Sequence, residues 1–261
     1  MNHTVYDNVV RADSNGITTL TLNRPDQFNA LSEALLKQLN QMLAEIGEDD
    51  TVRVVIIKAR GRAYCVGHDL KEMRENTDEA YLNSLFSKAG EVMLRIKHLP
   101  QPVIASVHSV AAAGGCQLVA ACDLAVASDK AKFAVSGINL GLFCSTPAVV
   151  LSRNISQKRA MEMLLTGDFI DAETALNYGL VNQVVPTDSL DEATITLAEK
   201  IASKPPAAVR MGKALFYQQL NQPLESAYQQ ASETITRNML LDETLEGVDA
   251  FIEKRSPEWQ R

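Results

Sequence analysis

The chain has 261 residues, of which 46% are apolar and 22% are charged, and its formal net charge is −7. This is ordinary globular composition, which excludes disordered, collagen-like and low-complexity classes. The acidic net charge and the lack of a long Lys or Arg run indicate that nucleic acid is not a partner.

Targeting and membrane signals are not evident in the sequence. Residues 1–11 have no basic stretch followed by an apolar segment and are not rich in Arg and Ser. No apolar run reaches the ~18 residues that a membrane helix needs. We therefore expect a cytoplasmic protein without a membrane partner. Four cysteines lack CxxC spacing, which predicts free thiols and no metal site; they are Cys65, Cys116, Cys122 and Cys144.

The N-terminal half alternates predicted strands and helices. Residues 9–12 and 17–22 read as two strands joined by an Asn15-Gly16 turn. Ser32 precedes a stretch with apolar residues at helical spacing up to Ile46. A buried strand is predicted over residues 52–57.

The next segment repeats this alternation. We predict a helix over residues 78–97, a strand over 103–107, a short helix over 111–121 and a strand over 123–127. The order favours an α/β fold with short sheets stacked in a spiral, and a doubly wound sheet stays open as the alternative.

The C-terminal part is predicted to be mostly helical. Thr146-Pro147 has the form of an N-cap and first turn, and residues 189–192 have capping-box form. Further helices are predicted to begin at Pro205-Pro206, at Pro223 and near Asp242. We expect a core over residues 1–204 and a helical extension over 205–261 that packs on the core or on a neighbouring subunit.

Two segments carry most of the chemical information. Residues 111–118 read AAAGGCQL and residues 133–141 read FAVSGINLG. Both resemble signature stretches of the enoyl-CoA hydratase/isomerase (crotonase) family, in which a working hydratase has a glutamate in each. Here those positions are Gln117 and Gly137. A carboxylate can carry a proton, whereas an amide only hydrogen-bonds and glycine has no side chain.

The resemblance runs from residue 23 to residue 255, with several motifs in the family's order. It implies a crotonase-like spiral of ββα units with a helical C-terminal extension that serves trimerisation. It also implies a homotrimer or dimer of trimers, and an acyl-CoA thioester as the ligand.

Residues 65–73, CVGHDLKEM, resemble the family's loop that leads into a helix and contacts the thioester. By this match the backbone N–H groups of His68 and Gly114 form an oxyanion hole, and Asp69, Leu70 and Lys71 lie along the acyl-CoA. Fixed N–H donors would stabilise the negative charge of an enolate oxygen. The alternatives are an exposed loop histidine at 68 and a tightly packed Gly-Gly pair at 114.

Recognition of coenzyme A involves both ends of the chain in this family. Asp26, Phe28 and Ala30 match a segment that contacts the nucleotide end, although Asp26 replaces a common basic residue. Phe251 and Lys254 match residues that reach the CoA of an adjacent subunit. An ordinary solvated charge is the alternative for Lys254.

Something must replace the lost acids if the protein is an enzyme. One branch of the family has glycine at the position of Gly137 and uses bound bicarbonate as the base, so we expect that Gly137 opens a space that bicarbonate could occupy. Cys144 aligns near a catalytic aspartate of that branch, and a buried inert thiol is the alternative. Apart from bicarbonate and from CoA as part of the substrate, no cofactor is predicted.

Two functions fit these residues. The first is a hydratase-like lyase or isomerase with an oxyanion hole, a nonstandard proton carrier and weak or absent ordinary hydratase activity. The second is a noncatalytic acyl-CoA-binding or assembly protein. Residues 135–139 and 141–147 further resemble the enoyl-CoA hydratase domain-containing protein 3 group, whose similarity bears on fold and ligand more than on reaction.

Overall fold

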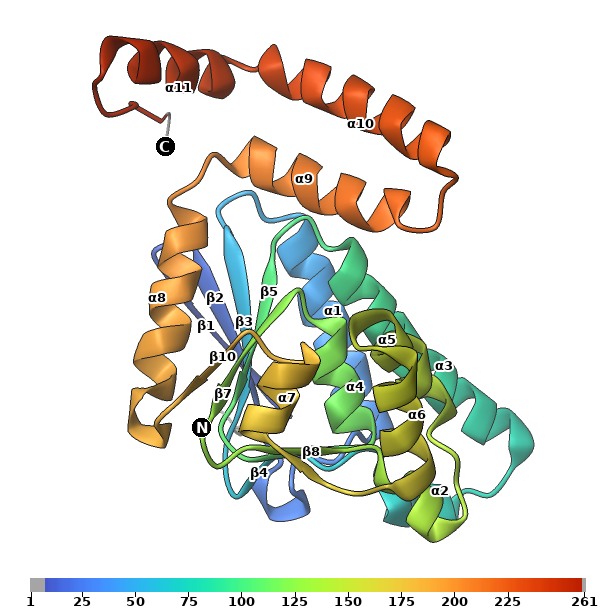
Figure 1. The fold of residues 1–261 in the computed structure, drawn as a ribbon. Helices are drawn as coiled ribbons and strands as arrows, with labels where there is room; N and C mark the ends of the chain where they lie inside the picture. Colours follow the sequence, from blue (N-terminus) through green and yellow to red (C-terminus); the bar gives the residue numbers. More distant parts are fainter. Residues whose placement is uncertain (1–7, 260–261) are drawn as a thin grey trace.

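The computed structural model describes residues 8–259, which form two sheets with helices around them (Figure 1). In the larger sheet β1 is antiparallel to β2 and all later neighbours are parallel. Its strand order is β1 (Val9–Ser14), β2 (Ile17–Leu22), β3 (Val54–Ala59), β5 (Val103–Val107), β7 (Leu124–Ser128) and β10 (Gln183–Val185). The smaller sheet has the order β4 (Ala63–Cys65), β6 (Val110–Ala112), β8 (Lys132–Ala134) and β9 (Ile170–Asp171).

The chain alternates between the two sheets and thereby forms a spiral. Each turn gives one long strand to the larger sheet, one short strand to the smaller sheet, and then helix. This confirms the predicted spiral of strand-strand-helix units and excludes a single doubly wound sheet. The helices of the three turns are α2 (Leu70–Glu75) with α3 (Glu79–His98), then α4 (Gly114–Ala121), then α5 (Ser145–Asn154) with α6 (Gln157–Thr166).

Local sequence signals account for several of these elements. Asn15 and Gly16 both have positive φ, of 51° and 76°, as the hairpin turn requires. The Ser32 side chain accepts a hydrogen bond from the Leu35 N–H at 3.2 Å and caps α1 (Glu33–Gly47). The apolar face of α1 lies in the core through Leu35, Leu36, Leu39, Leu43 and Ile46.

Three local predictions are wrong. The expected helix over 111–121 begins only at Gly114, because the preceding residues pair as β6 with β4 and β8. Thr146 lies inside α5, whose N-cap is Cys144. Ser189 precedes α8 (Leu190–Ala202) but its side chain makes no capping hydrogen bond, because its backbone is helical with φ −97° and ψ −1°.

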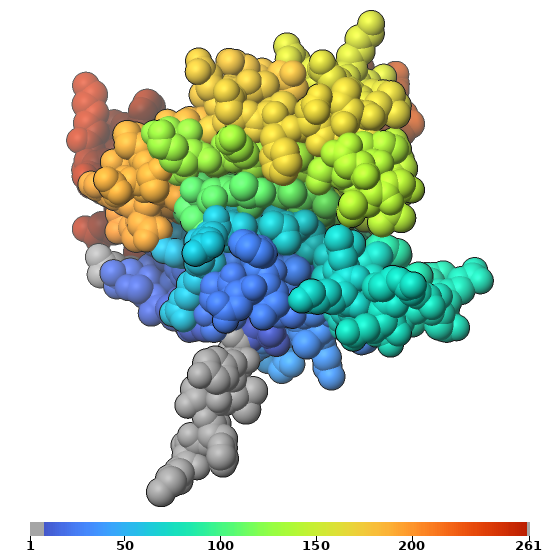
Figure 2. Space-filling model, turned by 90° about the horizontal axis from the view of Figure 1, so that it is seen from below, coloured from blue at the N-terminus to red at the C-terminus, as the bar shows by residue number. Residues whose placement is uncertain are grey.

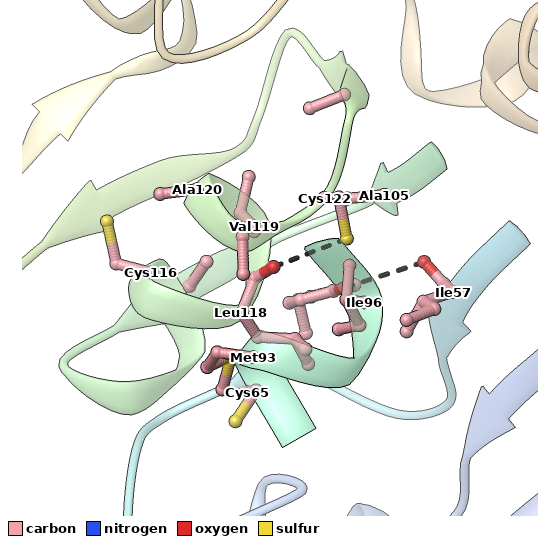
Figure 3. Packing of buried hydrophobic residues seen from close by; sticks show 14 of the residues in the cluster. Ile57, Cys65, Met93, Ile96, Ala105, Cys116, Leu118, Val119, Ala120 and Cys122 are labelled. Atoms are coloured by element: carbon pink, nitrogen blue, oxygen red, sulfur yellow. Dashed lines mark hydrogen bonds between the residues drawn. The ribbon is translucent and has the colours of Figure 1, made fainter. Parts of the chain in front are cut away.

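The cysteines lie in the core, as free thiols (Figure 3). Cys122 Sγ donates to the Leu118 carbonyl oxygen at 3.3 Å. Burial raises the pKa of Cys65, Cys116 and Cys122 to about 12, so these thiols are protonated and unreactive.

The last three helices lie beyond the body of the spiral (Figure 1). They are α9 (Pro206–Gln219), which crosses the end of the body, α10 (Leu224–Met239), which packs along α9, and α11 (Asp242–Glu253). The boundary expected between 204 and 205 falls in the turn between α8 and α9. The trimerisation role expected for the extension over residues 205–261 stays a prediction. Among the described helices, none combines the length and the apolar character needed to cross a membrane.

Candidate functional site

The loop between β4 and α2 lies directly against the start of α4. Gly67 has φ +99°, and a β-carbon on it would lie 2.8 Å from Ala113 Cβ and 3.1 Å from the Gly114 nitrogen. A β-carbon on Gly114 would lie 3.4 Å from His68 Nδ1. Glycine at both positions therefore permits a close backbone approach. His68 and Gly114 are far apart in the sequence, and the structure brings them together as predicted.

Within residues 8–259, the backbone N–H groups of His68 and Gly114 have no acceptor. Leu31 holds the loop on both sides of His68, since its N–H donates to the Gly67 oxygen at 2.8 Å and its carbonyl accepts from the Asp69 N–H at 3.2 Å. His68 pairs with Leu31 in an isolated parallel bridge, in which the flanking Gly67 and Asp69 make the hydrogen bonds, so the His68 N–H points away from Leu31. Gly114 is the first residue of α4, where N–H groups lack helical partners and the helix dipole is positive.

The residue before α4 is strained. Ala113 has φ 47° and ψ −116°, a conformation that favours glycine, and its N–H donates to the Ala134 oxygen at 2.8 Å. A backbone conformation of this kind costs about 1–3 kcal/mol of folding free energy and is typical of functional sites. A β-carbon on Gly115 would lie 2.0 Å from the Cys65 oxygen, so close packing explains this second glycine.

Gln117 lies one turn beyond Gly114 on α4 and is 4% exposed. Its Oε1 accepts a hydrogen bond from Thr146 Oγ1 at 3.3 Å, which joins α4 to α5. Thr146 was predicted to cap a helix, and its pairing with Gln117 was not predicted. The only sequence feature that could have indicated this hydrogen bond is a hydroxyl residue shortly after the 133–141 segment.

Gly137 does not open a space, contrary to the expectation from the sequence. A β-carbon there would lie 2.6 Å from the Leu142 carbonyl oxygen and 2.8 Å from Cys144 Sγ. The residues beside Gly137 therefore do not fit a bound bicarbonate in the side-chain direction. The prediction of bound bicarbonate was motivated by an open space beside Gly137, and Leu142 and Cys144 fill that space.

Cys144 is a buried thiol that accepts a hydrogen bond from the Gly137 N–H at 3.3 Å. Burial raises the pKa of this thiol, and the N–H contact opposes that rise only in part. Of the two readings of Cys144, the inert buried thiol fits this environment, because a thiol base needs a lowered pKa.

His68 is partly buried, which contradicts the alternative of an exposed loop histidine. It packs edge-on against Phe86 of α3, with ring centroids 5.1 Å apart and an interplanar angle of 76°. Burial lowers its pKa to about 4, so the ring is neutral near pH 7. Its Nε2 is buried without a hydrogen-bond partner within the described part of the chain.

The segment predicted to contact the nucleotide end of CoA lies beside the oxyanion loop. Figure 2 shows the face on which the blue segment near residue 25 adjoins the cyan segment near residue 65. Asp26 and Phe28 are exposed, whereas Ala30 is buried. Leu70 and Lys71 are exposed at the start of α2. Of these five predicted CoA-contact positions, four are open to solvent and Ala30 is not.

The Asp69 side chain has a structural role that the sequence analysis missed. Its Oδ1 accepts from the backbone N–H groups of Lys71 and Glu72, at 3.2 and 3.4 Å, and caps α2. Its Oδ2 forms an ion pair with Arg24 Nη2 at 2.9 Å. The family resemblance begins at residue 23 and so includes Arg24, but no role was predicted for it.

Phe251 and Lys254 lie apart from this site. Phe251 is 84% exposed on α11, and Lys254 ends that helix with φ 58°. Figure 1 places α11 at the opposite end of the molecule from α2. Their contact with CoA of an adjacent subunit stays a prediction. Over residues 8–259, no group of three or more His, Cys, Asp or Glu is placed to hold a metal ion.

Comparison with known proteins matches this architecture to a family. The Enoyl-CoA hydratase/isomerase family matches residues 12–261. The chain belongs to this family. Its fold is accordingly the crotonase fold, as the sequence resemblance implied.

Individual relatives agree with this assignment. The rat mitochondrial enoyl-CoA hydratase domain-containing protein 3 is 46% identical over 244 residues, covering 94% of this chain and 81% of the relative. The crystal structure of a Mycobacterium smegmatis enoyl-CoA hydratase is 54% identical, with a TM-score of 0.95 and coverage of 97% and 98%. That of the human domain-containing protein 3 is 44% identical, with a TM-score of 0.94 and coverage of 97% and 100%. The resemblance to the domain-containing protein 3 group is confirmed.

The expected cytoplasmic location is contradicted by these comparisons. The rat, mouse and human relatives are all named as mitochondrial proteins. The absence of a recognisable targeting segment in residues 1–11 was the basis of that expectation, and those residues lie mostly outside the described part of the chain.

Proposed function

We propose that this chain binds an acyl-CoA thioester and polarises its carbonyl group with the backbone N–H groups of His68 and Gly114. The observation that carries this proposal is the juxtaposition of two N–H groups, one of them at the start of α4, for which residues 8–259 provide no acceptor. Fixed donors of this kind stabilise negative charge as it develops on oxygen, and loss of one costs about 10²–10³-fold in rate.

The ligand class follows from family membership and from the neighbouring segments. A relative from Escherichia coli, 33% identical, is named 2,3-dehydroadipyl-CoA hydratase. Asp26, Phe28 and Lys71 are exposed, and the segment near residue 25 adjoins the segment near residue 65 on one face, where the nucleotide end of CoA would extend (Figure 2).

Proton transfer is the step that the site lacks. Gln117 and Gly137 take the two positions at which the resemblance places glutamates, and neither side chain can carry a proton at neutral pH. Each general acid or base contributes about 10²–10⁴-fold. The proposed enzyme is therefore a hydratase-like lyase or isomerase with weak hydration activity.

A specific observation supports a noncatalytic acyl-CoA-binding protein as a second candidate. The Gln117 amide is tied to Thr146, and the volume beside Gly137 is filled by Leu142 and Cys144. Both replaced positions are thus integrated into the packing, and neither holds an ionised group that could act as a base.

The experiment is a calorimetric titration with crotonyl-CoA and butyryl-CoA, followed by turnover assays on a panel of enoyl- and aroyl-CoA thioesters. Binding with turnover supports the enzyme, and binding without turnover supports the second candidate. Failure of both ligands and of the whole panel to bind contradicts both.

A further inference from the structure

We infer that Arg24 is a positioning residue, which couples the segment that contacts the nucleotide end of CoA to the oxyanion hole through its ion pair with Asp69. This inference rests on the proposed function and adds a role for a residue that touches neither the thioester nor the reacting atoms.

Arg24 donates two hydrogen bonds to its own segment and accepts others at its carbonyl oxygen. Its Nη1 donates to the Ala30 oxygen at 2.6 Å, and its backbone N–H donates to Asn29 Oδ1 at 2.9 Å. Asn29 is buried and donates from Nδ2 to the carbonyl oxygens of Arg60 and Ala63, both at 2.8 Å. The segment from 24 to 30 is thereby held as one unit.

The same guanidinium reaches the oxyanion loop. Its Nη2 pairs with Asp69 Oδ2 at 2.9 Å, and the two side chains are only 18% and 14% exposed. Partial burial reduces screening by water and salt and strengthens the attraction. Asp69 in turn caps α2 through Oδ1, so one carboxylate fixes both the end of the loop and the start of the helix.

Leu31 extends the connection to both donors. Its backbone brackets His68 through the hydrogen bonds with Gly67 and Asp69. Its Cδ1 lies 3.0 Å from where a β-carbon on Gly114 would stand, so its side chain supports the second donor. A displacement of the 24–31 segment would therefore move both N–H groups.

Oxyanion stabilisation depends steeply on geometry, and misplacement by about 1 Å can cost 10²-fold. A ligand that engages residues 26–30 with its nucleotide end restrains this segment and, through Arg24 and Leu31, the donors. Binding energy from the remote end of the ligand is then used at the thioester. We accordingly expect stronger carbonyl polarisation in acyl-CoA than in the matching acyl-pantetheine.

The test measures the carbonyl stretch of crotonyl-CoA labelled with ¹³C at the thioester carbon, bound at saturation to the full chain. The variants are Arg24→Gln, Arg24→Lys and Asp69→Asn. Arg11→Gln is the matched control, because Arg11 of β1 forms a comparable ion pair with Asp13 at 2.9 Å outside this connection.

We expect the wild type and Arg24→Gln to bind the ligand, with the downshift in Arg24→Gln reduced to less than half. Arg24→Lys should restore part of it, since an ammonium keeps the charge but not the guanidinium fork. Arg11→Gln should match the wild type.

An unchanged downshift in saturated Arg24→Gln overturns the inference. No binding or no downshift in the wild type overturns the proposed function instead. If Arg24→Gln does not fold, Asp69→Asn carries the test, since asparagine can still cap α2; a full downshift in that variant also overturns the inference.

Discussion

The backbone nitrogen of Gly137 lies 3.3 Å from Cys144 Sγ, and the same sulfur lies 2.8 Å from where a β-carbon on residue 137 would stand. Glycine at this position is therefore required by the packing of the 137–144 turn. The position that resembles a catalytic glutamate site has been rebuilt, and simple replacement of the side chain will not recover it.

Gly137→Ala should destabilise the protein by about 1–3 kcal/mol, because the added methyl group overlaps Leu142 and Cys144. Urea unfolding of the variant measures this change. Gly90→Ala in α3 is the control, since a β-carbon there meets no atom within 4 Å and alanine favours a helix. Equal stability of Gly137→Ala and wild type would contradict the packing described here.

Gln117→Glu should raise hydration of crotonyl-CoA by about 10²-fold, since a carboxylate there would accept from Thr146 and could carry a proton. Adding Gly137→Glu should give no further gain, because the second side chain cannot be accommodated. Steady-state assays of the single and double variants decide this. Gln117→Leu, which provides no acid, should show no gain, and a much faster double variant would refute the prediction.

The buried His68 should make stability depend on pH. Its pKa is lowered by burial to about 4, below the ordinary 6.5, so between these values the unfolded chain binds a proton that the folded chain does not. Stability is therefore full above pH 6.5 and falls by up to about 3 kcal/mol as pH decreases to 4. Urea unfolding from pH 7 to pH 4.5 should show a shallower fall in His68→Gln.

The exposed His98 provides the control for that measurement, and His98→Gln should keep the wild-type pH dependence. Identical curves for wild type and His68→Gln would show that the ring of His68 is accessible to protons in the folded protein.

Lys213 holds α9 on the body of the spiral. Its side chain is 6% exposed and donates to the Ile96 and Gln101 carbonyl oxygens, both at 2.9 Å, and to Asp123 Oδ2 at 2.6 Å. Lys213→Met would leave Asp123 buried without its cation and should cost about 3–5 kcal/mol. Thermal or urea unfolding measures the loss. The exposed Lys200→Met should change stability by less than ~0.5 kcal/mol.

The long elements could be predicted from sequence because their signals are local. The Asn15-Gly16 turn, the Ser32 cap and the apolar spacing of α1 depend on neighbouring residues only. The short strands of the smaller sheet could not be predicted in this way. Residues 111 and 112 read as the start of a helix, and with Val110 they form β6 only because distant residues in β4 and β8 pair with them.

The site shows the same division. The proximity of His68 to Gly114 could be predicted, because the family-like motifs that contain them occur in the family's order. The filled volume beside Gly137 could not, because it depends on a turn that brings Leu142 and Cys144 back to Gly137. No role was predicted for Arg24, because its partner Asp69 lies 45 residues away in the sequence.

A crystal structure with bound crotonyl-CoA tests the central claim most directly. We predict that the thioester carbonyl oxygen lies within about 2.7–3.1 Å of the backbone nitrogens of both His68 and Gly114. A ligand bound with its carbonyl oxygen away from these two nitrogens would contradict the account.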